Sequence, residues 1–210
     1  MPGVSVPASK KSCQPALSLL SCACKYTEET GMQLKKWLIC LGGLMLFGAT
    51  LVQAVEYKPP FDPANPRAVM QTSKGKLVIE LFPKNAPITV ENFIKLVKKE
   101  YYDGLTFHRY EPGFVIQGGD PKGDGTGGPG YTIKDEHKNG LLHIKGAMAM
   151  ARTNMPNSAG SQFYFCLEPT PFLDNNYTVF GQVVEGMDTV MLQLRRGDKM
   201  EKVTIQEVKK

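Results

Sequence analysis

Most of this chain has too few cysteines to form a disulfide bond. Of five cysteines in 210 residues, four lie within the first 40 residues, and only Cys166 lies beyond them. The C-terminal part can therefore form no internal disulfide, and its fold must depend on a hydrophobic core. The Cys22-Ala23-Cys24 pair has no second pair or histidines at zinc-site spacing, so we expect no metal there.

Concentrated positive charge is also missing. The formal net charge is +5, but residues 1–54 carry +3 of it, and residues 55–210 hold 20 basic against 18 acidic side chains. A nucleic-acid-binding domain needs a concentrated basic face, so we expect no nucleic-acid partner. Glycine and proline together number 36 and are spread evenly, which favours many short strands over a few long helices.

The chain has no recognisable constellation for covalent or acid–base catalysis. Its serines lack the strand–turn–helix context of a hydrolase nucleophile, and Cys166 lies in an apolar run typical of a buried, inert thiol. None of the three histidines forms a triad with a nucleophile; they are His108, His137 and His143. An enzyme with this inventory would carry out a reaction that needs no proton transfer.

The glycine-rich segment 118–130 could be misread in two ways. Gly123, Gly125 and Gly128 have dinucleotide-binding spacing, but Pro129-Gly130 prevents the helix that this motif requires, so a surface loop is favoured. The acidic residues between Asp120 and His137 leave a carboxylate–metal hydrolase open as a remote alternative. The position where an EF-hand requires Glu holds Tyr131. We therefore expect neither a cofactor nor a metal.

An export signal is predicted near the N-terminus. Lys35-Lys36 precedes an uncharged apolar run of about 16 residues, 37–52, and the segment closes with Val52-Gln53-Ala54, which is the pattern of a secretory signal peptide. The apolar run is shorter than the roughly 20 residues of a typical membrane-spanning helix. We predict a periplasmic or extracellular protein cleaved after Ala54, with retention as a membrane anchor as the other case. Translation from Met32 would give a conventional signal, and residues 55–66, rich in proline, predict an extended linker.

Residues 67–210 have the periodicity of one mainly β domain. Alternating or short apolar runs predict strands at 67–72, 76–81, 105–109, 114–117, 146–151, 162–167, 178–184 and 203–208. Helical spacing predicts one amphipathic helix from Val90 to about Glu100, capped by Thr89, and a second near 188–194. The pattern predicts an antiparallel barrel whose ends are covered by two helices.

Arg109 stands out because it lies among aromatic and aliphatic residues in TFHRYEPGFVIQGGD, residues 106–120. A charge in an apolar run is costly to bury without a partner. Taken alone, it is best explained as a structural ion pair with Glu111 or Asp120. GSQFYF, residues 160–165, similarly places Gln162 among aromatics.

These two stretches, followed by FLDNNYTVFGQVVEGMD, resemble in order and spacing the three main motifs of the cyclophilins, which are peptidyl-prolyl cis-trans isomerases. The pattern resembles the bacterial branch of the family. The resemblance covers residues 67–208. It implies a closed eight-stranded antiparallel barrel with a helix over each end, and a proline-binding groove on its outer face.

The resemblance also implies the site residues. Arg109 and Gln117 take the catalytic positions, with Gln117 either positioning the substrate carbonyl or orienting Arg109. The substrate-binding positions are His108, Phe114, Val115, Ala151, Arg152, Gln162, Tyr164, Phe172, Leu173 and Tyr177. Phe172 stands where the family often has Trp, which predicts weak cyclosporin binding.

The predicted function is isomerisation of X–Pro bonds in proline-containing polypeptides that are folding, by a monomer. A non-catalytic proline-peptide-binding or chaperone module would use the same groove. A rate measurement is what separates the two.

Overall fold

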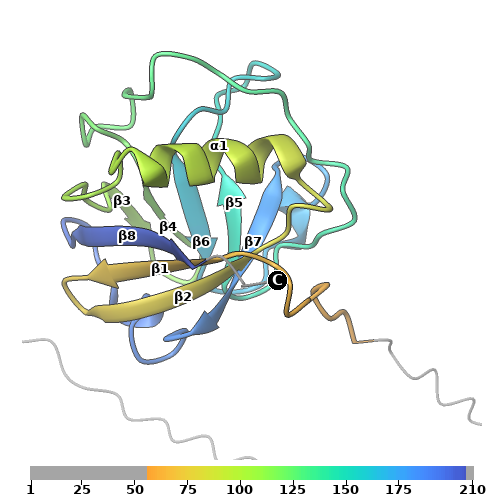
Figure 1. Cartoon of the computed structure of the whole chain (residues 1–210), viewed down its shortest axis with the longest axis horizontal. Coiled ribbons are helices and arrows are strands. Elements are labelled where there is room, and N and C mark those ends of the chain that lie inside the picture. The colour runs from red at the N-terminus through yellow and green to blue at the C-terminus, as the bar shows by residue number, and fades with distance from the viewer. Residues whose placement is uncertain (1–55, 207–210) are drawn as a thin grey trace, which may run out of the picture. The chain divides into compact units, whose positions relative to one another are not determined.

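The computed structural model of the chain describes residues 56–206 (Figure 1). The predicted signal segment, its cleavage site and the alternative start at Met32 lie outside these residues. Residues 55–210 cluster as one compact unit. Within the described part, no helix is both long enough and apolar enough to cross a membrane.

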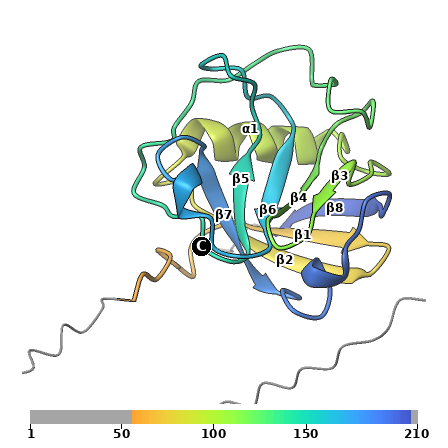
Figure 2. The same cartoon turned by 180° about the vertical axis from the view of Figure 1, so that it is seen from behind.

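The domain is built on one sheet of eight antiparallel strands that curls into a half-barrel (Figures 1 and 2). The strand order across the sheet is β3-β4-β6-β5-β7-β2-β1-β8. The strands are β1 Arg67–Thr72, β2 Gly75–Leu81, β3 Arg109–Glu111, β4 Val115–Gly118, β5 Ala147–Met150, β6 Phe163–Cys166, β7 Val179–Glu185 and β8 Met200–Gln206. A mainly β fold with eight antiparallel strands is thereby confirmed.

Closure of the barrel is not confirmed. The two end strands, β3 and β8, share no ladder in the described part of the chain. The segments just before them meet instead, through one bridge between Thr106 and Lys199 and a 2.8 Å bond from the Phe107 amide to the Asp198 carbonyl. The segment predicted as a strand at 105–109 is therefore mostly irregular. Strand β3 begins only at Arg109.

Both faces of the central strands are buried. Phe163 and Phe165 of β6 point into the half-barrel and pack edge-to-face on each other at 5.6 Å between ring centroids. The alternate residues, Tyr164 and Cys166, are equally buried on the outer face. The outer face therefore carries a second apolar cluster, made of Phe82, Val115, Leu141, Ala147, Ala149, Tyr164, Cys166 and Val179.

One α-helix, α1 (Pro87–Lys98), packs against the half-barrel through Val90, Phe93 and Val97 (Figure 1). It begins earlier than predicted because Pro87 occupies its first turn, where a missing N–H costs nothing. Thr89 is inside the helix and is not its cap. Glu136, from the loop before β5, accepts bonds from the amides of Ile88 and Thr89 at 3.1 and 2.9 Å and so caps the helix from a distance.

The prediction of a second α-helix near residues 188–194 is wrong. Residues 188–194 form turns and a 3₁₀ segment, η2 (Met191–Gln193). Seven residues are too few to offset the cost of nucleating an α-helix, and a tighter turn suffices to bury the apolar residues Val190, Met191 and Leu194.

Residues 56–66 lie along the domain. The buried Glu80 carboxylate accepts bonds from the Asp62 amide at 2.8 Å and from the Asn65 side chain at 3.0 Å. Phe61 contacts Phe82 with 6.1 Å between ring centroids. The segment predicted as a linker is thus attached to β2 by specific contacts.

Candidate active site

The candidate site follows one row of residues across the outer face of the sheet. The strand register places Arg109 opposite Gln117, Gln117 opposite Tyr164, and Tyr164 opposite Ala149. Residues paired in this way point to the same face, so Arg109 of β3 lies beside the apolar cluster of β4, β5 and β6. The two predicted catalytic residues are therefore direct neighbours.

Arg109 is less buried than the sequence suggests. Its side chain is 47% exposed, because it stands on the end strand of the sheet. Its Nε contacts Glu111 Oε1 at 3.3 Å, and its Nη1 donates to Gln117 Oε1 at 3.4 Å. The predicted ion pair with Glu111 is thus present, but both groups are about half exposed, so it contributes little to stability. The rest of the guanidinium stays available to a ligand.

Asp120 does not pair with Arg109. It is buried and accepts the backbone amides of Lys122, Asp124 and Gly125, which keeps the pKa of its carboxyl below the usual value despite desolvation. Asp120 therefore organises the glycine-rich loop that follows β4.

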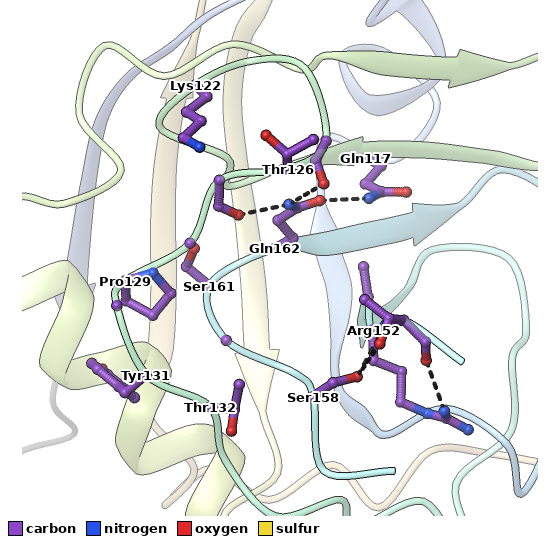
Figure 3. Close-up of a pocket in the computed structure, with 17 residues that line it drawn as sticks. Gln117, Lys122, Thr126, Pro129, Tyr131, Thr132, Arg152, Ser158, Ser161 and Gln162 are labelled. Carbon is purple, nitrogen blue, oxygen red and sulfur yellow. Dashed lines mark hydrogen bonds between the residues drawn. The ribbon is translucent and has the colours of Figure 1, made fainter. Parts of the chain in front are cut away.

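Gln117 and Gln162 form a chain of amides that ends on that loop (Figure 3). Gln117 Nε2 donates to Gln162 Oε1 at 2.8 Å, and Gln162 Nε2 donates to the carbonyls of Gly125 and Gly127 at 2.9 and 2.8 Å. With its oxygen facing Arg109 and its nitrogen facing Gln162, Gln117 is placed to orient Arg109.

Beside Arg109 lies a pocket of about 320 Å³ that is lined by both polar and apolar side chains. Nine residues line it: Arg109, Phe114, Val115, Gln117, Ala151, Arg152, Tyr164, Leu173 and Tyr177. All nine are predicted site residues, drawn from four strands or strand ends and the 171–177 turn. Arg152 donates to the Asn176 carbonyl, lies 3.7 Å from the Asp135 carboxylate and stacks 5.1 Å from the Tyr177 ring centroid. It contributes a wall rather than a free charge.

Three predicted substrate-binding residues lie outside this lining. Gln162 lies one layer further, in the neighbouring pocket. Phe172, in the 3₁₀ segment η1 (Pro171–Leu173), is 68% exposed on the rim and stacks on Phe114 with 5.6 Å between centroids. His108 is buried, and neither ring nitrogen has a hydrogen-bond partner among the described residues. Burial therefore lowers the pKa of His108.

A second, larger pocket of about 730 Å³ adjoins the first and shares Gln117, Ala151 and Arg152 with it (Figure 3). Its far wall is the glycine-rich loop, 125–130, with Tyr131. Sequence reasoning treated this loop only as surface. Gly119, with φ +82° and the Ser161 carbonyl where a Cβ would lie, is the position that allows the loop to fold back beside Gln162.

The sequence also gave no signal for a buried group behind Tyr164. His143 Nε2 lies 3.0 Å from the Tyr164 hydroxyl, and His143 Nδ1 lies 2.8 Å from Asp174 Oδ1. The three residues are far apart in sequence, and only the register and the 171–177 turn bring them together. Cys166 lies next along β6; burial raises the pKa of its thiol to about 11, so it is an inert thiol, as predicted.

Chemically, the site offers a charged fork of N–H donors at the edge of a pocket that lies over the outer-face apolar cluster. Among residues 56–206, no group of three His, Cys, Asp or Glu side chains is arranged to hold a metal ion. No nucleophile and base line the pocket together. The arrangement suits binding of an apolar ring with an amide placed against Arg109.

Comparisons with known proteins agree with this geometry. The model of the cyclophilin type peptidyl-prolyl cis-trans isomerase family matches residues 67–210. A peptidyl-prolyl cis-trans isomerase of Synechococcus elongatus is 46% identical over 140 residues, which is 66% of this chain and 95% of that protein. Peptidyl-prolyl cis-trans isomerase B of Bacillus subtilis is 48% identical over 133 residues, covering 63% of this chain and 92% of the relative.

Solved structures show the same fold. A Cryptosporidium parvum cyclophilin type isomerase, crystallised in the presence of the dipeptide Ala-Pro, superposes with a TM-score of 0.62 at 30% identity, covering 67% of this chain and 98% of that one. The cyclophilin AquaCyp293 of Hirschia baltica gives a TM-score of 0.60 at 25% identity, covering 71% and 81%. Motifs, fold and pocket lining therefore lead to one conclusion: the chain belongs to the cyclophilin-type peptidyl-prolyl cis-trans isomerase family.

Proposed function

We propose that this protein accelerates X–Pro isomerisation by stabilising the twisted amide with Arg109 while the adjoining pocket holds the proline ring. The observation that carries the proposal is the pairing of Arg109 with Gln117 at the edge of a pocket that lies over the outer-face apolar cluster.

The chemical reasoning begins with amide resonance. Twisting the X–Pro bond destroys the resonance, and the nitrogen regains a lone pair that the planar amide does not have. A donor directed at that nitrogen binds the transition state better than either ground state, which is the condition for catalysis. Arg109 is suited to this because the guanidinium is always charged and presents several donors in a rigid fork.

Substrate binding would complete the site. Arg109 is half exposed in the free protein, so water weakens its interactions there. A proline ring placed against Phe114, Leu173 and Tyr164 would displace that water and strengthen the bond from Arg109. An acceleration on the order of 10⁵ requires only about 7 kcal/mol off the barrier.

A protease-coupled or exchange-NMR assay on an X–Pro peptide tests the proposal. The protein should accelerate isomerisation catalytically, and Arg109→Ala should remove most of the acceleration while still binding the peptide. A folded wild-type protein that binds proline peptides without accelerating their isomerisation would contradict it, and would favour the non-catalytic binding or chaperone module.

The client class is part of the proposal. With an N-terminal signal, the clients would be exported polypeptides with slow prolyl steps in folding. Fractionation of cells that express the full chain, with N-terminal sequencing of the mature protein, tests this. A cytoplasmic protein that retains residues 32–54 would contradict export.

A further inference from the structure

His143 is a buried, titratable residue for which the proposed reaction has no use. Its side chain is fully buried, yet both ring nitrogens are hydrogen-bonded, Nδ1 to Asp174 and Nε2 to Tyr164. Tyr164 lines the pocket and is paired with Gln117 in the sheet. His143 thus lies directly behind the pocket floor.

The direction of these hydrogen bonds follows from the partners. Asp174 Oδ1 also accepts the His143 backbone amide, so it acts as an acceptor and Nδ1 carries the proton. Burial lowers the pKa of His143, so the ring is neutral and Nε2 is an acceptor. The Tyr164 hydroxyl must therefore donate to Nε2, and its raised pKa keeps that proton in place.

The backbone of His143 holds the same turn at both ends. Its carbonyl accepts the Thr170 amide at 2.8 Å, and its amide donates to Asp174 Oδ1 at 2.8 Å. Between these points the turn carries Phe172 and Leu173, the rim and one wall of the pocket. These backbone contacts do not depend on the His143 side chain, so a side-chain substitution isolates the two ring contacts.

We propose that His143 is a positioning residue: its ring links Tyr164 in the pocket floor to Asp174 in the 171–174 turn, and so sets the affinity for the proline ring. The inference rests on the proposed function, because the pocket is taken to be the proline site. His143 does not touch the reacting amide, so it should affect binding and leave the rate of the bound substrate unchanged.

The surroundings of the linked residues are neutral apart from two groups. Asp174 interacts electrostatically with the Tyr57 hydroxyl of the N-terminal segment and with the Cys166 thiol, and Tyr164 with Tyr177 and Arg152. Arg152 and Asp174 are the only charged members of this set, and Arg152 is engaged by Asn176. Asp174 is thus the charge that sets the His143 tautomer.

Three variants of the full-length protein test the inference: His143→Phe, Tyr164→Phe and the double variant. Each single change breaks the hydrogen bond between His143 and Tyr164, so the double change loses that same contact only once. The probe is the dipeptide Ala-Pro, titrated by NMR, with KM and kcat measured on an X–Pro peptide. Tyr110→Phe, which removes a hydroxyl from β3 outside the pocket, is the control.

We expect each single variant to raise the Kd for Ala-Pro and the KM about three- to tenfold with kcat within about twofold. The double variant should lose no more than His143→Phe, because the link between Tyr164 and Asp174 is already broken in that variant. Three results would overturn the inference: losses of the two single variants that add in the double variant, an unchanged Kd in both single variants, or a loss confined to kcat. In the wild type, nitrogen-15 shifts should show His143 protonated only at Nδ1; protonation at Nε2 would overturn it without any variant. A wild type that binds Ala-Pro but lacks isomerase activity would overturn the proposed function alone.

Discussion

Gln117 accepts a hydrogen bond from Arg109 and sits directly opposite it in the β3–β4 register, with 3.4 Å between Nη1 and Oε1. The side-chain nitrogen of Gln117 donates to Gln162 Oε1, and Gln162 is in turn held by two loop carbonyls. The orientation of a half-exposed arginine on an end strand is therefore set by the second pocket as well as the first.

Replacing Arg109 with Ala should lower kcat/KM at least about a hundredfold, because the charged donor at the twisted amide is lost. Stability should change by less than about 1 kcal/mol, because the contact with Glu111 is a surface pair. An isomerisation assay and a urea denaturation curve measure the two quantities. Arg109→Lys is the matched control. It keeps the positive charge but not the forked donors, so its kcat/KM should lie between those of the wild type and Arg109→Ala. Near-wild-type activity of folded Arg109→Ala would remove Arg109 from the mechanism.

Gln117→Leu should lower kcat/KM about tenfold, because a hydrogen bond to a charged group contributes roughly 1.5–3 kcal/mol and its loss leaves Arg109 free to reorient. Gln162→Leu, one step further along the amide chain, should have a smaller effect. The ranking is read from kcat/KM on one peptide. A greater loss in Gln162→Leu than in Gln117→Leu would show that Gln162 contacts the substrate itself.

Local periodicity was sufficient to predict most strands and the core of α1, because alternation and helical spacing directly record which face is buried. The helix start was not predictable in this way. Its cap is the Glu136 side chain, which comes from a loop distant in sequence, so no local capping signal exists. The second helix failed because its apolar spacing is equally well satisfied by a short turn.

The free energy of unfolding should fall as the pH is lowered from about 7 to 5. His108 and His143 both have pKa values below the ordinary 6.5 because burial disfavours the charged ring. Below pH 6.5 the unfolded chain then binds more protons than the folded one, so acid favours unfolding, by at most about 1.4 kcal/mol per pH unit for each histidine. Urea midpoints across this range give the slope. His143→Phe should flatten it; an identical slope in that variant would show that His143 does not contribute.

Glu136→Ala should destabilise the protein by about 1–2 kcal/mol, because the amides of Ile88 and Thr89 lose their acceptor at the helix N-terminus. Activity per folded molecule should not change. Chemical denaturation is the measurement. Glu185→Ala, which removes an acid from an exposed pair with Lys76, is the control and should change stability by less than about 0.5 kcal/mol. Equal effects from the two substitutions would rule out a special role for the cap.

Glu80→Ala should release residues 56–66 from the domain, because the buried carboxylate is the shared acceptor for Asp62 and Asn65. We expect a loss of about 1–3 kcal/mol and new cleavage sites in this segment. Limited proteolysis with mass mapping detects them. Asp62→Ala, which keeps Glu80, should expose the segment less. An unchanged cleavage pattern in Glu80→Ala would show that other contacts hold it.

The site was predictable residue by residue where the motifs lie on paired strands, as at Arg109, Gln117 and Tyr164. The motifs carry no information about solvent exposure. Arg109 was therefore expected to be more buried than it is, and Phe172 was expected to line the pocket. His143 was invisible for another reason: it belongs to no motif, and its partners, Tyr164 and Asp174, are joined to it only by tertiary packing.

The order of the strands has a consequence for how the chain reaches its native state. β1 pairs with β8 along its whole length, with Arg67 opposite Gln206. Of the eight described strands, β1 is synthesised first but cannot complete its pairing until β8 has been synthesised. Partial chains would leave the edge of β1 unpaired, and contacts between such distant residues are slow to form. A member of a family of folding isomerases thus has a topology in which its own β1 cannot complete its pairing before β8 has been synthesised.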